Sequence, residues 1–356
     1  MIEFTDVTKE YGAQSVLREG SFRINPGERV GLVGPNGTGK STVFRMIAGE
    51  VSPDSGRVTM PRDVRIGYLH QELNVEDESR SLIEYAENAL PEARAIHERM
   101  VAVEHRMSQP DGTASAADLR KLGDLQTRFE AMGGYDLRVR AEATLSGLGF
   151  DPEGFDAPFD AFSGGWQMRA EMARVLVARP DVLLLDEPTN YLDIPAVEWL
   201  QRFLREYRGT LLLISHDRYL LNSLTDVTLE LAAGRVTRYA GNHDFYVRER
   251  VLRRRQAESA RKNQDRRRQQ IERFVERFRA KNTKASQVQS KIKMLERMEE
   301  EEVEAPAVAV SPGCIRLRPA ARCGREVVRL DEAGFTYDGE RWVLRGVNLR
   351  IERGEK

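Results

Sequence analysis

Four short apolar runs, each bounded by turn residues, occur in the first two thirds of the chain. Each has the length of a strand, and three of them, at residues 28–33, 182–185 and 210–214, read as strands that are buried on both faces of a sheet. The runs span residues 28–33, 63–69, 182–185 and 210–214. Helical periodicity predicts helices over residues 39–48, 165–178 and 195–207. Strands that alternate with helices in this order predict an α/β fold whose mainly parallel sheet carries helices on both faces.

Two longer regions show helical periodicity. Residues 81–148 are predicted to be helical, with a break at residues 109–113, where Pro and Gly fall close together. Further along, apolar residues recur at helical spacing on both sides of residues 281–284. These apolar positions are Ile271, Phe274, Val275, Phe278, Val288, Ile292 and Leu295. We therefore predict two amphipathic helices that form a hairpin and pack through this stripe, and a helix of about 30 residues would be roughly 45 Å long.

Charge is distributed unevenly along the chain. Residues 248–297 contain 18 Lys and Arg against 6 Asp and Glu, a net charge of +12, although the whole chain has a net charge of −1. The remaining residues are therefore acidic as a group. A basic segment on an acidic body is typical of an arm that binds a polyanion. A solvated charged hairpin that binds nothing is the alternative interpretation.

The composition excludes several classes of protein. With 40% apolar and 31% charged residues, the chain resembles a globular protein with charged helices rather than a disordered one. Its apolar runs are far shorter than the roughly 20 residues that a membrane span needs, and its charged N-terminus has no signal-peptide core. Cys314 and Cys323 form no CxxC motif, which argues against a disulfide framework or a zinc site. We expect a cytoplasmic protein without stable membrane insertion.

A short internal repeat links the two ends of the chain. Residues 343–356 match residues 16–29 at seven of fourteen positions, and Tyr337 corresponds to Tyr11 if one residue is inserted. We infer that a second copy of the first domain begins near Arg325 and stops at Lys356, before the position that would match Gly34. Chance similarity between two strand–turn segments is the alternative.

A glycine-rich motif follows the first predicted strand and opens a predicted helix, which is the context of a P-loop. The motif consists of Gly34, Pro35, Asn36, Gly37, Thr38, Gly39, Lys40, Ser41 and Thr42. Its glycines let backbone N–H groups close around phosphate oxygens, and the helix N-terminus adds a partial positive charge. We expect Lys40 to reach the β- and γ-phosphates of ATP, Ser41 to bind Mg²⁺ and Thr42 to hold the α-phosphate. A glycine-rich turn that serves only packing is the alternative.

Two adjacent acids follow the apolar run at residues 182–185. Asp186 would bind Mg²⁺ through water, and Glu187 would orient or deprotonate the water that attacks ATP. Taken alone, a strand followed by two exposed acids at a turn is an ordinary structural feature. The P-loop upstream makes a nucleotide site the stronger interpretation.

A third motif begins 23 residues before Asp186. Ser163, Gly164 and Gly165 precede a predicted helix and would form a second anion-binding N-terminus, although a Ser N-cap followed by glycines is common. The order of P-loop, Ser-Gly-Gly motif and acidic strand end resembles that of an ATP-binding cassette. The resemblance covers residues 1 to about 240. It extends to Gln71, Asp193 and His216.

The resemblance implies roles for residues outside the P-loop. In such cassettes an aromatic residue near the N-terminus stacks on adenine, which Tyr11 matches, with a core aromatic as the alternative. Gln71 would sense Mg²⁺ and the attacking water, and His216 would contact the γ-phosphate rather than being a plain histidine at a strand end. The Ser-Gly-Gly motif, together with Gln167, would close over ATP that a partner cassette holds. The resemblance also places Asp193 among the residues that bind the nucleotide.

The basic segment indicates the branch of this superfamily. Tandem cassettes that lack membrane domains and are joined by a charged helical linker are the ABC-F proteins, and residues 271–285 and 289–297 resemble that linker. One departure is Gln167, where members often carry a basic residue. Members of the family act on ribosomes. The resemblance implies that the linker approaches the peptidyl-tRNA and couples the ATP state to translation or to antibiotic protection.

Arginines and lysines of the linker would contact rRNA and tRNA through their phosphates and by stacking on bases. The candidate contacts are Arg253, Arg254, Arg255, Arg266, Arg267, Arg268, Arg279, Lys281 and Lys284. The helical insert near residues 81–132 is either a second ribosome-contacting arm or the ordinary helical subdomain of the cassette.

These observations predict a P-loop NTPase fold with four parts in order. We expect a first cassette at residues 1–243 with a helical subdomain at about 75–180, a basic helical linker at 244–303, a loop at 304–325 and the first strands of a second cassette at 326–356. The predicted function is a ribosome-binding ABC-F ATPase that converts ATP and water to ADP and phosphate. The alternatives are a cytosolic ATPase subunit of a membrane transporter and a binding module without turnover.

The number of motifs bears on activity. The chain contains one P-loop and one Ser-Gly-Gly motif, so that each composite site lacks its other half. We expect weak ATP binding and little hydrolysis unless two copies meet head to tail, with Lys40 of one beside Ser163 of the other.

Overall fold

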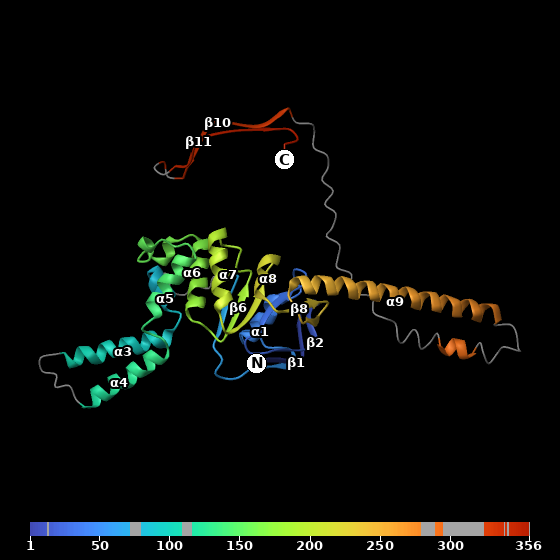
Figure 1. Cartoon of the computed structure of the whole chain (residues 1–356), viewed down its shortest axis with the longest axis horizontal. Helices are drawn as coiled ribbons and strands as arrows, with labels where there is room; N and C mark the ends of the chain where they lie inside the picture. Colours follow the sequence, from blue (N-terminus) through green and yellow to red (C-terminus); the bar gives the residue numbers. More distant parts are fainter. Residues whose placement is uncertain are drawn as a thin grey trace. The chain divides into compact units, whose positions relative to one another are not determined.

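The computed structural model describes residues 1–12, 14–71, 80–108, 116–278, 289–294, 324–337, 339 and 342–355 (Figure 1). The chain divides into two units, Met1–Ala307 and Val308–Lys356. Within the described ranges, no helix combines the length and the apolar character that crossing a membrane requires.

The first unit is built on a six-stranded sheet in the order β5-β6-β7-β3-β8-β9. Its strands are β3 (Arg29–Val33), β5 (Ile66–Leu69), β6 (Val182–Asp186), β7 (Thr210–Ile214), β8 (Val227–Ala232) and β9 (Arg235–Tyr239). All neighbouring pairs are parallel except β8 and β9. The predicted mainly parallel sheet is confirmed. The strand predicted at residues 63–69 begins three residues later, because the residues before Ile66 form a turn.

A second, antiparallel sheet lies on one side of the P-loop helix and was not predicted. It consists of β1 (Ile2–Tyr11), β2 (Gln14–Ile24) and β4 (Ser55–Thr59), in the order β2-β1-β4. One apolar core joins this sheet, the helix α1 (Lys40–Ile47) and one face of the central sheet. The helix is therefore held between two sheets, which fixes the loop at its N-terminus.

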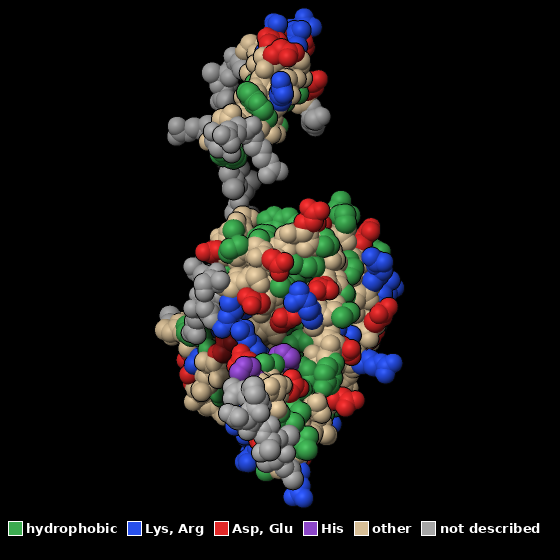
Figure 2. Space-filling view, turned by 90° about the vertical axis from the view of Figure 1, so that its left-hand side faces the viewer, with side chains coloured by type: hydrophobic (Ala, Val, Ile, Leu, Met, Phe, Trp, Pro, Cys, Tyr) green, Lys and Arg blue, Asp and Glu red, His purple; other side chains and the backbone are tan. Residues whose placement is uncertain are grey.

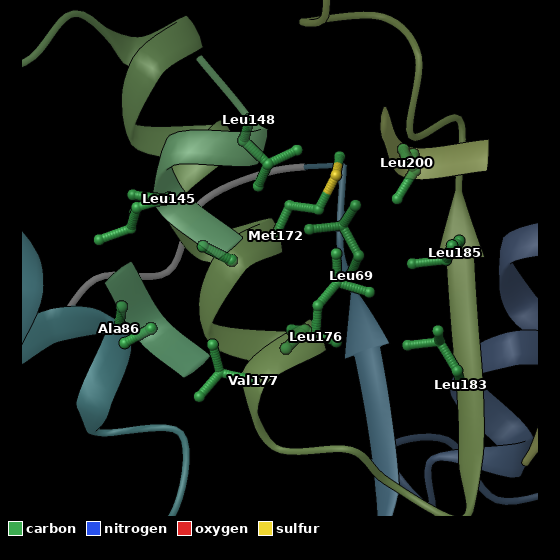
Figure 3. Packing of buried hydrophobic residues seen from close by; sticks show 14 of the residues in the cluster. Leu69, Ala86, Leu145, Leu148, Met172, Leu176, Val177, Leu183, Leu185 and Leu200 are labelled. Atoms are coloured by element: carbon green, nitrogen blue, oxygen red, sulfur yellow. The ribbon is translucent and has the colours of Figure 1, made fainter. Parts of the chain in front are cut away.

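Helices lie on the other side of the central sheet. They are α2 (Leu82–Glu87), α5 (Leu137–Gly147), α6 (Gly164–Val177), α7 (Ile194–Glu206) and α8 (Arg218–Leu224), with short 3-10 turns at Pro152–Gly154 and Phe159–Ala161. Of these helices, α2 and α5 pack on α6 rather than on the strands. Figure 3 shows Leu69, Leu183 and Leu185 of the sheet pointing toward the side chains of α6. Alternate residues of β6 enter the two different cores, so the continuous apolar run correctly predicted a strand buried on both faces.

The predicted helical region at residues 81–148 is divided more finely than we expected. It contains α2, α3 (Pro91–Met107), α4 (Ala116–Ala131) and α5. Breaks lie at residues 88–90 and 132–136, whereas the predicted break at 109–113 lies outside the described residues. Helices α3 and α4 pack on each other and bury Ile96, Met100 and Phe129 (Figure 1).

The basic segment begins as one long helix, α9 (His243–Phe278), of 36 residues. Its length corresponds to about 54 Å. Ile271 is buried and Val275 is half-buried, as the predicted apolar stripe requires, whereas Ile292 is exposed. The turn of the predicted hairpin lies outside the described residues, so the hairpin remains a prediction.

The second unit is a two-stranded antiparallel hairpin of β10 (Glu326–Thr336) and β11 (Trp342–Glu352). Its register repeats that of β1 and β2. The pairs Ile2–Ile24, Phe4–Phe22, Val7–Gly20 and Lys9–Leu17 correspond to Val328–Ile351, Leu330–Leu349, Ala333–Val347 and Phe335–Leu344. Asp6 and Glu332 occupy the same left-handed backbone position, with φ of 48° and 49°. The sequence repeat is thus also a repeat of backbone geometry.

Candidate functional site

One crevice lies at the carboxyl ends of β3, β6 and β7, where open parallel sheets usually bind ligands. The structure brings most of the predicted nucleotide residues to its walls. The lining residues are Tyr11, Gln14, Val16, Asn36, Gly37, Gly39, Lys40, Ser41, Thr42, Gln71, Asp186, Glu187, Asn190, Ile214 and His216. Gln14, Val16, Asn190 and Ile214 were not predicted as site residues, although Asn190 lies between the predicted residues Glu187 and Asp193.

The P-loop adopts a conformation that glycine makes accessible. Gly39 is the N-cap residue of α1 with φ of 94°, and a Cβ atom there would lie 2.1 Å from Cγ1 of Val16. At Gly34 an added Cβ atom would lie 2.2 Å from the carbonyl oxygen of Leu231 in β8. The loop is therefore packed tightly against both β2 and β8 at these two positions. A side chain at Gly39 would overlap the side chain of Val16, and one at Gly34 would overlap the backbone of Leu231, so both positions favour glycine.

Lys40 lies across its own loop and faces two acids. Its ammonium group donates hydrogen bonds to the carbonyl oxygens of Gly34 and Pro35, at 3.0 and 3.1 Å. Burial lowers the pKa of Lys40, and the negative charges of Glu187 and Asp186 oppose this effect. These weak carbonyl contacts leave the ammonium group able to exchange its partners for phosphate oxygens.

Asp186 ends β6 in a buried position. Burial raises the pKa of Asp186, and this rise is opposed by hydrogen bonds from Ser41 and Gln71 and by the charge of Lys40. The amide of Gln71 donates to Oδ1 at 3.1 Å, whereas the buried Oδ2 atom has no hydrogen-bond partner within the described part of the chain. Hydroxyl, amide and carboxylate oxygens around one unsatisfied atom are a donor set that fits Mg²⁺.

Glu187 follows in a left-handed backbone conformation, with φ of 51°. Its side chain is 8% exposed. Oε2 accepts a hydrogen bond from the backbone N–H of His216 at 3.1 Å, and Oε1 lies 3.6 Å from Nε2 of the same residue. The strained backbone and this contact orient a carboxylate into the crevice, which is the arrangement that a general base requires.

Tyr11 is 49% exposed at the end of β1, so the alternative of a core aromatic is excluded. The ammonium group of Lys9 lies 5.4 Å from the centre of its ring. An exposed ring at the rim of the crevice is available for stacking.

Comparison with known proteins agrees with this geometry. Two family models described as ABC transporter match residues 17–190 and 229–311. The probable ATP-binding protein YheS of Escherichia coli K12 is 35% identical over 356 residues, which is all of this chain and 53% of that protein. ATP-binding cassette sub-family F member 3 of Pongo abelii is 33% identical over 99% of this chain and 48% of its own length. The uncharacterized ABC transporter ATP-binding protein YfmM of Bacillus subtilis is 31% identical over the whole chain, which spans 68% of that relative.

The chain belongs to the ABC-F family of ATP-binding cassette proteins. It contains an ATP-binding ABC ATPase domain and spans about half the length of YheS and of sub-family F member 3. A solved structure titled "Structure of ATP binding subunit of ABC transporter" has the same fold. It aligns with a TM-score of 0.52 at 23% identity, over 71% of this chain and 94% of that one.

The structure does not bring the Ser-Gly-Gly motif of this ABC-F chain into the crevice that contains Lys40. Ser163 is the N-cap of α6 without a side-chain hydrogen bond to the helix, and an added Cβ atom at Gly164 would meet nothing within 4 Å. The amide of Gln167 reaches the carbonyl oxygen of Phe159 at 3.4 Å. Asp193 caps α7 and forms an ion pair with Arg169 at 3.3 Å. The open N-terminus at Ser163 therefore lies at a separate surface of the cassette.

The basic helix of the ABC-F chain is anchored by a buried carboxylate that the sequence did not reveal. Glu230 of β8 is 8% exposed. It accepts hydrogen bonds from the hydroxyls of Tyr239 and Tyr246 at 3.0 and 2.9 Å, and Arg250 pairs with it at 3.0 Å. In the sheet register Glu230 lies beside Val33, the last residue before the P-loop. The root of α9 is therefore attached to the strand next to the nucleotide site.

The predicted RNA-binding residues fall into three groups. Arg253, Arg254 and Arg268 form ion pairs with Glu249, Glu258 and Glu272 one turn away. Arg255, Arg266 and Arg267 are exposed and have no ion pair with any described residue. The remaining candidates, Arg279, Lys281 and Lys284, lie outside the described residues.

The end of the first unit that carries α3 and α4 shows a different distribution of charge. Figure 2 shows this face with Lys and Arg side chains interspersed among Asp and Glu. Ion pairs such as Arg94–Glu98 and Arg138–Glu142 contribute to this mixture. A polyanion attracts clustered positive charge, so a second ribosome-contacting arm at residues 81–132 remains a prediction without support from this face.

Proposed function

We propose that the chain is the nucleotide-binding and linker part of an ABC-F protein that binds ribosomes and uses ATP to control the position of its basic helix near tRNA. The observation that carries this proposal is the attachment of α9 to β8, because β8 also contacts the P-loop at Gly34. The P-loop and the basic helix α9 are thus both in contact with β8.

In the proposed reaction, the P-loop N–H groups and Lys40 bind the β- and γ-phosphates of ATP. Tyr11 stacks on adenine. Ser41, Gln71 and Asp186 would hold Mg²⁺, which would neutralise phosphate charge when bound. Glu187 orients a water molecule and accepts its proton as the oxygen attacks the γ-phosphorus and the bond to ADP breaks. His216 contacts the transferred phosphoryl group.

A closed site needs a second cassette, because Ser163 lies away from the crevice of its own chain. We propose that Ser163, Gly164, Gly165 and Gln167 close over ATP bound by the partner cassette, and that Asp193 supports the same surface. The hairpin β10–β11 has the register of the first hairpin of the cassette. This match supports the proposal that it begins the second copy.

Sedimentation with ribosomes tests the proposal. The chain extended by its second cassette should pellet with purified ribosomes, and Glu187→Gln should make this binding more persistent in ATP, because the closed state would no longer be released by hydrolysis. Glu198→Gln on α7 is a control that leaves the crevice unchanged. Release of the Glu187→Gln variant as fast as the control would contradict the proposal, and association with membranes instead would favour a transporter subunit.

A further inference from the structure

The end of β1 that carries Tyr11 extends beyond one of the two strands beside it. Pairing with β4 ends at Thr8, whereas pairing with β2 continues to Tyr11. The register with β2 also shifts between Lys9 and Glu10, so the ladder is irregular there. Backbone pairing alone therefore holds this end of β1 less firmly than the part of the strand before Thr8.

Asp54, the residue before β4, takes the place of a strand partner at this end of β1. Its backbone N–H donates a hydrogen bond to the carbonyl oxygen of Thr8 at 2.9 Å. Oδ2 of its side chain accepts a hydrogen bond from the backbone N–H of Glu10 at 2.7 Å, and Oδ1 accepts one from the ammonium group of Lys9, also at 2.7 Å. The hydrogen bond from Lys9 lowers the pKa of Asp54, so the carboxylate is charged at neutral pH. One carboxylate thus holds both the backbone and a side chain of β1.

Lys9 connects this carboxylate to the ring of Tyr11. The side chain of Lys9 is only 13% exposed, and its ammonium group lies over the ring at 5.4 Å from the centroid. A cation in this position is attracted by the electrons of the aromatic face. Among the described residues Tyr11 lines the crevice and Lys9 does not. The ammonium group therefore occupies one face of the ring, and the exposed remainder of the ring is left for a ligand in the crevice.

We propose that Lys9 and Asp54 are positioning residues, which hold the ring of Tyr11 with one face free for the adenine of ATP. This inference rests on the proposed function, in which Tyr11 stacks on adenine. A side chain that is already held loses less conformational entropy when a ligand binds to it. The pair Lys9–Asp54 therefore raises the affinity for the base of the nucleotide and leaves the affinity for its phosphates unchanged.

Direct contact with phosphate is the other role that a lysine near a nucleotide could have. The geometry favours Lys40 for that role, because Lys40 lines the crevice, whereas Lys9 is paired with Asp54 outside it. A lysine that met phosphate would change the affinity for any triphosphate, with or without a base, since the attraction depends on charge alone. The two roles therefore differ in their effect on a triphosphate that has no base.

The test compares the binding of ATP with that of inorganic tripolyphosphate, which has three linked phosphates and no base. Competition against a fluorescently labelled ATP measures both affinities, and all variants carry Glu187→Gln so that ATP persists during the measurement. Lys9→Met should lower the ratio of the ATP affinity to the tripolyphosphate affinity about two- to fivefold, which is the contribution of a cation–π contact to an exposed ring. Asp54→Asn should change the ratio in the same direction, because it releases Lys9.

Two further variants are controls. Lys9→Arg should keep the ratio, since a guanidinium group can also pair with a carboxylate and lie over an aromatic ring. Arg57→Met removes a positive charge from the same small sheet, because Arg57 is exposed on β4 opposite Thr5. It lies away from the ring and should leave the ratio unchanged.

Equal decreases in the affinities for ATP and for tripolyphosphate in Lys9→Met would overturn the proposal, and so would an unchanged ratio. Tyr11→Ala shows which claim has failed. It should lower the ratio about tenfold, which is the usual effect of losing one stack between a base and an aromatic ring. If Tyr11→Ala lowers the ratio and Lys9→Met does not, only this inference fails. If neither variant lowers it, the stacking role of Tyr11 in the proposed function fails as well.

Discussion

Replacing Glu230 with alanine should destabilise the attachment of α9 more than any exposed substitution in the same helix. The change removes the acceptor of two tyrosine hydroxyls whose residues are only 4% and 5% exposed. A buried polar group that loses its partner costs about 1–3 kcal/mol. Part of this cost is offset, because a buried carboxylate no longer has to be desolvated. Arg250 is about half exposed and can be solvated instead.

The net decrease in the free energy of unfolding should therefore be about 2–4 kcal/mol. Urea unfolding measures it, with Glu258→Ala as a matched control. That control breaks the exposed pair with Arg254 and should cost at most about 1 kcal/mol. Hydrogen exchange should show faster opening of the first two turns of α9 in Glu230→Ala only.

A second step tests the cause. Adding Tyr239→Phe and Tyr246→Phe to Glu230→Ala should recover part of the lost stability, because removing both partners of a hydrogen bond is nearly neutral. If the free energies of unfolding of Glu230→Ala and Glu258→Ala agree within about 0.5 kcal/mol, the buried carboxylate does not hold the helix.

Three further predictions concern the cassette. Glu187→Gln should slow ATP hydrolysis about 10²–10⁴-fold with little change in ATP affinity, measured by phosphate release and by equilibrium binding; a decrease below tenfold would remove Glu187 as general base. Gly39→Ala should lower the free energy of unfolding by about 2–4 kcal/mol, because its Cβ atom would overlap Val16. Gly37→Ala is the control, since its Cβ atom would enter open space, and it should lower the free energy of unfolding by only about 1–2 kcal/mol. Equal decreases in the two variants would refute the overlap. Burial and the charge of Glu230 raise the pKa of Tyr239 to about 12. Its contribution to stability is complete below about pH 10, where this tyrosine starts to ionise in the unfolded chain, and is lost as the pH rises toward 12. The free energy of unfolding, measured at increasing pH, should therefore decrease by about 2 kcal/mol less in Tyr239→Phe than in the unchanged chain.

Most of the residues that local motifs indicated as a nucleotide site lie together in one crevice. The P-loop, Asp186 and Glu187 each carry their chemistry within a few consecutive residues, and the parallel sheet brings their strand ends to one edge. The continuous apolar runs also predicted the central strands, since β6 and β7 are buried on both faces.

The parts that were missed have weak local signals. In β1 the alternation of buried residues is interrupted by bulges on both sides of Val7, so Ile2, Phe4 and Val7 do not follow the period of two that identifies a strand. The Glu230 anchor was missed for another reason. Its partners Tyr239, Tyr246 and Arg250 come from β9 and α9, and none of them is unusual by itself.

The hairpins β1–β2 and β10–β11 have a bulge at the same position, and a different pair of side chains spans it in each hairpin. In β1–β2 the backbone N–H of Asp6 donates to the hydroxyl of Ser21, which donates back to the aspartate, both at 2.8 Å. In β10–β11 Glu332 and Asn348 form the same reciprocal clasp at 2.7 and 2.8 Å. A short pair in one hairpin thus corresponds to a longer pair in the other, so changing only one member of either pair would remove the reciprocal contact that spans the bulge.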